Sequence, residues 1–115
     1  MERILLPLSE ATFYILLSLT SGPKHGYAIL KDVTVLSRKA LELSTSTLYG
    51  ALSRLQEQNL IIRIESTADD AGGPGLPRKA FQLTDLGRRT LEAESIRLQH
   101  QAQAAQLFLR TERPS

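Results

Sequence analysis

The segment that decides the fold is Ser44–Asn59, which reads STSTLYGALSRLQEQN. Ser44, Thr45 or Ser46 can cap a helix, and leucines then recur at helical spacing at positions 48, 52 and 55. The opposite face is small, hydroxylated and lightly charged, and comprises Ser46, Thr47, Tyr49, Gly50, Ser53, Arg54 and Glu57. We therefore predict a helix with one narrow buried stripe and one polar outer face.

A β-hairpin is predicted directly after this helix. Leu60–Glu65 (LIIRIE) and Lys79–Leu83 (KAFQL) both have strand character. The loop between them contains Gly72–Pro77 (GGPGLP), where glycines permit positive φ and prolines exclude a helix. The hairpin should therefore carry a long tip that can approach a surface closely, with the cations Arg78 and Lys79 at its base.

Two helices are predicted before Ser44. Ser9 can cap a helix over residues 10–20, which Ser21-Gly22-Pro23 ends. A second helix should run from about His25 towards Ala40. Its apolar residues follow steps of four, three and four on one helical face, and they are Ile29, Val33, Leu36 and Ala40.

A long final helix should begin at Thr84-Asp85 and reach about Arg110. Its apolar seam is thin and consists of Leu91, Ser95, Leu98, Ala102, Ala105 and Leu109. A long helix with so few large apolar residues is not stable by itself and has to pack against another surface. A second copy of the chain is one candidate for that surface. We expect the tail, residues 111–115, to be disordered.

The predicted fold class is mainly α with a small β-hairpin. Three helices followed by a hairpin are typical of a winged helix-turn-helix, whose third helix enters the major groove and whose hairpin reaches an adjacent part of the duplex. We predict this domain over residues 1–84 and a dimerisation helix over residues 85–110, followed by the tail.

Composition indicates one ordinary folded domain. The chain has 115 residues, of which 42% are hydrophobic and 23% charged. Cysteine is absent, which excludes disulfides and thiolate zinc sites and agrees with a cytoplasmic protein. The strongly apolar run Phe13–Leu19 is far shorter than the ~20 residues of a membrane span. The N-terminus has no features of a signal peptide, so we expect a soluble cytoplasmic protein without membrane partners.

The small net charge of +2 hides a grouping of charges along the chain. Between residues 24 and 54 five cations stand against two acids, and between residues 78 and 89 four cations stand against one. Between these two basic segments, residues 55–77 carry one cation and four acids. Two basic segments therefore flank an acidic one, and the small net charge alone does not describe the charge distribution.

No catalytic or metal site is predicted. His25 has no second histidine or cysteine at ligand spacing, and the adjacent acids Asp69 and Asp70 fall in a loop, where such pairs are usually solvated. The glycine-rich loop lacks the Gly-Lys-Ser/Thr of a phosphate-binding loop. With no nucleophile and base paired, we expect neither enzyme activity nor a cofactor.

Three segments resemble the PadR family of bacterial transcriptional regulators. They are SGPKHGYAIL at Ser21–Leu30, STLYGALSRLQEQNLI at Ser46–Ile61 and PRKAFQLTDLGRRTLEAE at Pro77–Glu94. The resemblance implies a homodimer that binds double-stranded DNA at a pseudo-palindromic operator, usually as a repressor, with a single C-terminal dimerisation helix. Relatives often respond to small aromatic compounds, some bound at the dimer interface, so an effector of that kind is a further expectation.

The sequence departs from the family at three places. Leu48-Tyr49-Gly50 stands where the family usually has Leu-Tyr-Pro, so the third helix lacks the rigidity of proline. Gly75-Leu76-Pro77 stands where Gly-Arg-Pro is common, which removes one cation from the tip. The chain has no tryptophan, which argues against an effector site built on indole stacking.

The residues expected to contact DNA are Lys24, Tyr27, Thr45, Ser46, Thr47, Tyr49, Ser53, Arg54, Arg78 and Lys79. The third helix would read bases, while the cations would hold the phosphate backbone. Two of these assignments compete with other roles. Tyr49 could be packing, and Arg54 could pair with Glu57 on a solvated surface.

The expected dimer interface consists of Phe13, Tyr14, Leu17, Leu91, Leu98, Ala102, Ala105 and Leu109. A different class of function stays open beside the DNA-binding one. Because the net charge is modest and the tip lacks an arginine, the winged helix could instead be a protein-interaction module without specific DNA binding.

Overall fold

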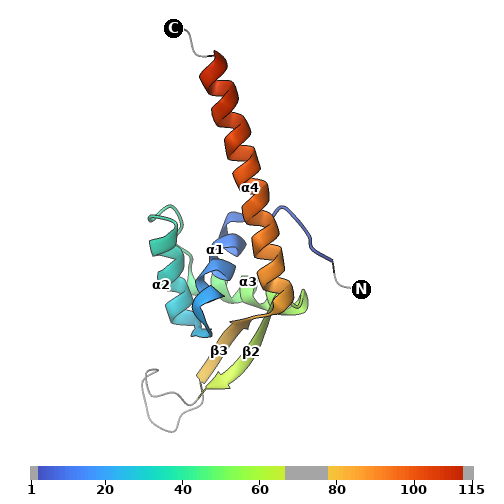
Figure 1. Cartoon of the computed structure of the whole chain (residues 1–115). Coiled ribbons are helices and arrows are strands. Elements are labelled where there is room, and N and C mark those ends of the chain that lie inside the picture. Colours follow the sequence, from blue (N-terminus) through green and yellow to red (C-terminus); the bar gives the residue numbers. More distant parts are fainter. Residues whose placement is uncertain (1–2, 67–77, 113–115) are drawn as a thin grey trace.

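The structure is a computed structural model that describes residues 3–66 and 78–112 (Figure 1). Its elements are α1 (Glu10–Ser18), the 3-10 turn η1 (Leu19–Ser21), β1 (Lys24–His25), α2 (Gly26–Leu36), α3 (Thr45–Glu57), β2 (Ile61–Ser66), β3 (Arg78–Leu83) and α4 (Asp85–Glu112). The predicted class is confirmed, since the chain is mainly helical with a small antiparallel sheet and a long C-terminal helix.

Hydroxyl caps begin three of the helices where the sequence predicts them. The Ser9 hydroxyl accepts the N–H of Thr12 at 3.1 Å, and the Ser44 hydroxyl accepts the N–H of Thr47 at the same distance. At the start of α4, the N–H of Gly87 donates to Thr84 Oγ1 at 2.9 Å. Each cap satisfies a backbone donor that the first helical turn leaves unpaired.

Helix α2 is shorter than predicted. It ends at Leu36, because Arg38 (φ 54°) and Lys39 (φ 68°) adopt left-handed backbone conformations that no α-helix can contain. The first two members of the predicted stripe are fully buried, whereas Leu36 and Ala40 are exposed. The apolar spacing was therefore a reliable guide only to the first half of the predicted helix.

The sheet has three strands in the order β1-β3-β2, all antiparallel. The hairpin strands pair from Ile61 opposite Leu83 to Ser66 opposite Arg78. The two-residue strand β1, which the sequence analysis did not predict, lies along the other edge of β3. His25 Nδ1 lies 3.1 Å from the carbonyl oxygen of Lys79, and since a carbonyl only accepts, the ring donates from Nδ1. The hairpin is thus attached to the start of α2.

One hydrophobic core joins the helices to the sheet. Its buried side chains include Ile15, Leu16, Ile29, Val33, Leu48, Leu52, Leu55, Ile61, Phe81, Leu86 and Leu91. Burying an aliphatic side chain of this size contributes about 1.5–3 kcal/mol. The predicted leucine stripe of α3 belongs to this cluster. On the opposite face of α3 most side chains are exposed.

The two halves of α4 have different surroundings. Leu86, Thr90, Leu91 and Glu94 are buried against the rest of the chain. From Ser95 onwards every described side chain is exposed, apart from a half-buried arginine at position 97. Figure 1 shows this second half projecting away from the other elements, and the molecule is accordingly elongated, 65 × 36 × 23 Å. The helix includes residues 111 and 112, which were predicted to be disordered, while residues 113–115 lie outside the described part.

A buried carboxylate anchors the N-terminal segment to α4. Glu94 is only 1% exposed, and its Oε2 accepts the N–H of Leu8 at 2.8 Å. Arg97 donates to both carboxylate oxygens, at 2.5 and 3.0 Å. These bonds, that of Arg97 above all, lower the pKa of Glu94 even though burial acts in the opposite direction. Glu94 is therefore an ionised anchor at neutral pH.

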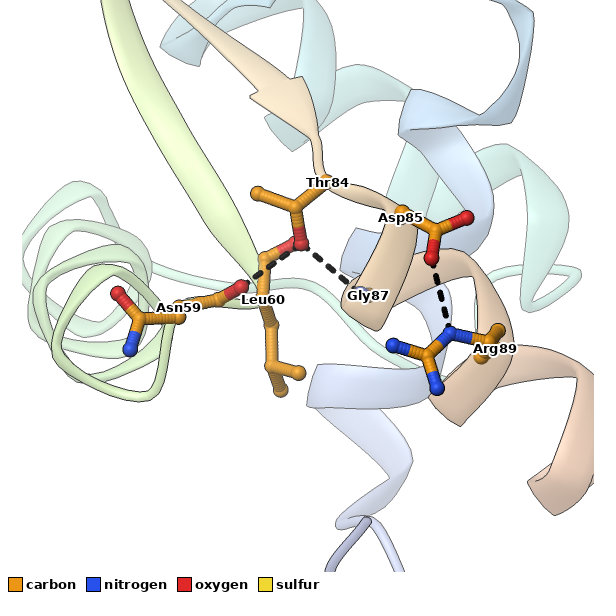
Figure 2. A network of polar contacts seen from close by, with 6 residues as sticks. All are labelled: Asn59, Leu60, Thr84, Asp85, Gly87 and Arg89. Carbon is orange, nitrogen blue, oxygen red and sulfur yellow. Dashed lines mark hydrogen bonds and ion pairs between the residues drawn. The ribbon is translucent and has the colours of Figure 1, made fainter. Parts of the chain in front are cut away.

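A second polar network joins the start of α4 to the turn between α3 and β2 (Figure 2). Thr84 Oγ1 donates to the carbonyl oxygens of Asn59 and Leu60, at 2.7 and 3.0 Å. Gly87 allows the close approach, because a Cβ there would lie 2.1 Å from the Leu60 carbonyl oxygen. The end of α3 and the beginning of α4 are thus held together as one unit.

Candidate nucleic-acid interface

The outer face of α3 is exposed and polar, as the sequence predicts. Thr45, Ser46, Thr47, Ser53 and Arg54 are all exposed. The Ser44 hydroxyl lies 2.9 Å from Thr47 Oγ1, so the first turn carries a small cluster of hydroxyl groups. The unpaired N–H groups and the positive dipole of a helix N-terminus favour a phosphate or another anion. This end of α3 therefore offers hydrogen-bond donors suited to a nucleic acid.

Arg54 is free to contact a ligand. The structure records no ion pair between Arg54 and Glu57 in the described part of the chain, so the predicted alternative role is not observed. Its Nη1 lies 3.7 Å from the point where a Cβ on Gly50 would stand. The arginine thus extends back along the exposed face of α3, beside the position at which the family usually has proline.

Tyr49 has the packing role that the sequence leaves open beside a contact with DNA. The side chain is 42% exposed, but its hydroxyl lies so close to Gly26 that a Cβ there would be 2.2 Å from Tyr49 Oη. The ring also meets Phe81 edge to face, with centroids 6.3 Å apart. Tyr49 therefore joins α3 to the start of α2 and to β3, and only the rest of its ring is available to a partner.

Tyr27 and Lys31 form an exposed pair on α2. Tyr27 is 72% exposed, and Lys31 Nζ lies 5.5 Å from the centroid of its ring. This is a cation–π distance. Lys31 was not among the predicted contacts, although its position four residues after Tyr27 places both on one helical face. The pair adds a cation to the surface that α2 presents.

Lys24 is less available than the sequence predicts. Its ammonium group forms an ion pair with Asp32 Oδ2, which also accepts the hydroxyl of Ser18 at 3.0 Å. The lysine side chain is 26% exposed. Because an acid of the same chain already neutralises this charge, Lys24 has less to gain from a phosphate than an unpaired cation has.

The base of the hairpin supplies Lys79, which is exposed on β3. The backbone of Arg78 belongs to the same strand, but its side chain lies outside the described residues. The glycine- and proline-rich tip, with the Gly75-Leu76-Pro77 departure, and the acids Asp69 and Asp70 also lie outside them.

The predicted dimer residues fall into three groups. Phe13, Tyr14 and Leu17 are half-buried on α1, and the two rings meet edge to face at 5.4 Å. On α4 the seam residues Leu98, Ala102, Ala105 and Leu109 are exposed. Leu91 requires a correction: it is 6% exposed within the core of its own chain, so it has almost no surface left for a partner.

The structure offers little to other kinds of site. In residues 3–66 and 78–112, no group of three or more histidine, cysteine, aspartate or glutamate side chains is placed to hold a metal ion. Within the same ranges no helix combines the length and the apolar character that crossing a bilayer requires.

Residues 15–93 match the transcriptional regulator PadR-like family. The chain belongs to this family. The matched region extends from the buried face of α1 through the hairpin to the first half of α4, and so includes every element that forms the core. PadR-like proteins are transcriptional regulators, which confirms the expectation that this one is not an enzyme.

Solved PadR-like structures share this fold. A PadR family transcription regulator from hypervirulent Clostridium difficile is 29% identical, with a TM-score of 0.73 over 88% of this chain and 99% of that one. A PadR-like transcriptional regulator from Bacillus cereus is 20% identical, with a TM-score of 0.71 over 85% and 89%. PadR of Bacillus subtilis, solved in complex with operator DNA, is 24% identical, with a TM-score of 0.60 over 71% and 44%.

A longer protein shares the sequence pattern of this PadR-like chain. A 37.1 kDa protein in transposon TN4556 of Streptomyces fradiae is 33% identical over 87 residues, which are 76% of this chain. The chain spans only 22% of the length of that relative. The similarity therefore concerns one part of the transposon protein.

Proposed function

We propose that this PadR-like regulator is a cytoplasmic repressor that binds a pseudo-palindromic DNA operator as a homodimer. The observation that carries the proposal is the outer face of α3, which is exposed, rich in hydroxyl groups and, apart from Tyr49, not packed against the rest of the chain. Exposed cations lie on the adjacent elements α2 and β3. The similarity of fold to a protein solved with operator DNA supports the same conclusion.

In this proposal α3 enters the major groove. Ser46, Thr47 and Ser53 present hydroxyl groups that can donate to or accept from base edges. Arg54 lies on the same face and would hold a phosphate at the groove edge. The exposed part of the Tyr49 ring adds an apolar contact, while its packing on Gly26 fixes the angle at which α3 meets the duplex.

Cations beside α3 would set the register on the DNA. Lys31, held over the ring of Tyr27, and Lys79 at the base of the hairpin are both exposed. Arg78 precedes Lys79 on the same strand and would add another phosphate contact. We expect Lys24 to contribute least, because Asp32 already neutralises it. Neutralising phosphates with these cations releases counterions and makes the affinity depend on salt.

Dimerisation would use the exposed second half of α4 together with α1. Leu107, Phe108 and Leu109 are 57%, 64% and 70% exposed, which is unusual for three consecutive large apolar side chains. A second copy that packs against them and against Phe13 and Tyr14 would bury this surface. The two α3 helices of the dimer would then face half-sites about one helical turn apart. A small aromatic effector that relieves repression would act on this dimer.

Selection of bound sequences from a random duplex library at ~100 mM salt tests the proposal, followed by affinity against salt on the enriched sequence. We expect an inverted repeat with half-sites about 10 base pairs apart. The double variant Arg78→Ala, Lys79→Ala should lower the slope of log affinity against log salt by about 2. As a matched control, Arg110→Ala on the second half of α4 should leave the slope unchanged.

A protein-interaction module remains the second candidate function. The ion pair of Lys24 with Asp32 favours it, because this pair reduces the positive charge that a DNA-binding surface would use. Under this alternative the library yields no enriched sequence at any salt concentration. The chain would instead form a stoichiometric complex with another protein, and charge-reversal of Arg54 would weaken that complex.

A further inference from the structure

Three of the described glycines lie in helices, and two of them have a visible reason inside the chain. Gly26 begins α2, and a Cβ there would lie 2.2 Å from Tyr49 Oη. Gly87 lies in the first turn of α4, where a Cβ would be 2.1 Å from the Leu60 carbonyl oxygen. Because both distances are too short for a side-chain atom, packing within the chain requires glycine at these two positions.

Gly50, in the middle of α3, has no such reason. A Cβ there would lie 3.7 Å from Arg54 Nη1, which is an ordinary van der Waals distance. Among the described residues beyond its neighbours along the helix, no other atom lies within 4 Å of that point. Glycine inside a helix lowers its stability relative to alanine. Alanine would therefore fit and strengthen α3, so the fold itself does not require glycine here.

Gly50 occupies the centre of the outer face of α3. The residues three and four positions before and after it on the helix are its neighbours on that face. They are Ser46, Thr47, Ser53 and Arg54, and all four are exposed. Because Gly50 has no side chain, it leaves a gap between these four side chains, through which a partner can approach the helix backbone.

Arg54 lies over this gap in the free chain. Side chains of a helix point back toward its N-terminus, and the position of Arg54 Nη1 beside Gly50 agrees with this direction. No ion pair of the described residues involves Arg54. The arginine is therefore able to turn to a phosphate at the groove edge, and this movement leaves the gap above Gly50 open to the bases.

The chemistry around the gap favours an apolar group of small size. The Gly50 Cα lies at its floor, and Thr47 and Arg54 contribute a methyl group and a methylene stem to this part of the face. In the major groove, thymine is the one standard base that presents a methyl group, and it is recognised by apolar contact with groups such as the threonine methyl. A thymine methyl therefore matches the gap in both size and polarity.

We propose that Gly50 determines specificity by admitting the C5-methyl group of one thymine in each half-site against the backbone of α3. The helix can then sit closer to the bases at this position than a residue with a side chain would allow. The inference rests on the proposed function, in which α3 reads the major groove, and it adds the base that the centre of the helix selects.

Uracil substitution in the operator tests the contact, because uracil lacks only the C5-methyl group of thymine. Each thymine of the enriched sequence is replaced in turn, and affinity is measured by fluorescence anisotropy. We expect one position per half-site at which uracil weakens binding about fourfold, and about fifteenfold when both half-sites are changed. Uracil at a flanking thymine outside the half-sites is the control and should leave affinity unchanged.

Gly50→Ala tests the role of the glycine itself. Its Cβ occupies the gap, so the variant should bind the thymine operator at least about fourfold more weakly than the wild type. It should bind the thymine and uracil operators equally. Since the added Cβ meets only Arg54 at an ordinary distance, the melting temperature should not fall, and a lower value would contradict the open space above Gly50.

Lys79→Ala is the matched control for a loss of affinity without a loss of base contact. As a proposed phosphate contact, Lys79 should contribute equally to both operators, so the variant weakens both and keeps the fourfold difference between thymine and uracil. It should also lower the slope of log affinity against log salt by about 1, whereas Gly50→Ala should leave the slope unchanged.

The outcomes separate this inference from the proposed function. An enriched operator without a uracil-sensitive thymine in its half-sites overturns the inference, while the operator itself still supports the proposed function. The same holds if Gly50→Ala retains the difference between thymine and uracil. If the library selection yields no operator, the proposed function fails and the role of Gly50 fails with it.

Discussion

The two halves of α4 share one continuous backbone and differ in almost everything else. The first half buries Leu86, Leu91 and Glu94 within the same chain, whereas the second half, from Ser95, is exposed apart from the half-buried Arg97. The first half of α4 is therefore part of the core of the chain, whereas the second half presents its surface to other molecules. We infer that the winged-helix domain extends to about Glu94, past the boundary between residues 84 and 85 that the sequence predicts.

The second half needs a partner for energetic reasons. Isolated helices of this length are marginal in water, and most helical stability in proteins comes from packing of an apolar face. The described structure gives Leu107, Phe108 and Leu109 nothing to pack against. Substitutions that disturb the packing of one half of α4 should leave the other half intact, and the largest effect is expected at Gly87.

Gly87→Ala should disrupt the packing of the first half of α4. Its Cβ would lie 2.1 Å from the Leu60 carbonyl oxygen, so α4 must shift away from the turn after α3, at a cost of about 3 kcal/mol. Urea unfolding measures the loss. The matched control is Gly50→Ala, whose Cβ meets only Arg54 at 3.7 Å and should stabilise the chain by about 0.5–1 kcal/mol. Equal effects of the two variants would contradict the close contact at Gly87.

Protonation of Glu94 should lower the free energy of unfolding by less than Gly87→Ala does. The folded chain holds the pKa of Glu94 below its ordinary value, so the unfolded chain takes up this proton more readily. The contribution to stability is complete above the ordinary glutamate pKa of about 4.3 and declines as the pH falls through the lower folded value.

Glu94→Gln tests this contribution, because it removes the charge and keeps an oxygen that can accept from Leu8. We expect a loss of about 1–2 kcal/mol at pH 7 and a flatter decline in acid, measured by urea unfolding at several pH values. The control Glu92→Gln, an exposed neighbour, should reproduce the wild-type curve. A wild-type pH profile in Glu94→Gln would assign the acid sensitivity to another group.

The double variant Phe108→Asp, Leu109→Asp should disrupt only the proposed association through the second half of α4. If these side chains form the dimer interface, the dimer dissociation constant should rise at least about tenfold, because each buried apolar side chain contributes about 1.5–3 kcal/mol. Sedimentation velocity over a concentration series measures the change, and the unfolding free energy of the monomer should stay within about 0.5 kcal/mol. Gln103→Glu is the matched control, and a wild-type chain that is monomeric throughout would exclude this interface.

Ala104→Gly should have the smallest effect. Glycine inside an exposed helix costs about 1 kcal/mol relative to alanine. Because Ala104 lies in the second half, helical circular dichroism should fall slightly at protein concentrations where the chain is monomeric, while cooperative unfolding of the domain stays unchanged. A matching loss of domain stability would mean that the two halves unfold together.

The features predicted correctly have local signals. Ser9 and Ser44 cap helices because their hydroxyls bond donors three residues ahead, and the leucine spacing of α3 lies within that one helix. The hairpin follows from two strands separated by a loop rich in glycine and proline. The family resemblance rested on three such local segments and is confirmed by the match over residues 15–93.

The features that were missed depend on contacts between distant residues. Strand β1 exists only because Lys24 pairs with Phe81, and the packing of Tyr49 depends on Gly26 in another helix. Leu91 fits a dimer seam by spacing, but the sequence does not show that it is buried in the core of its own chain.

The short strand β1 also affects how the sheet meets other molecules. Of the described strands, β1 and β2 form its edges. β1 has only two residues before the chain turns into α2, and the longer edge β2 carries the exposed charges Arg63 and Glu65. Short and charged edges discourage the addition of strands from other chains. The hairpin can therefore project toward a ligand while remaining protected from aggregation.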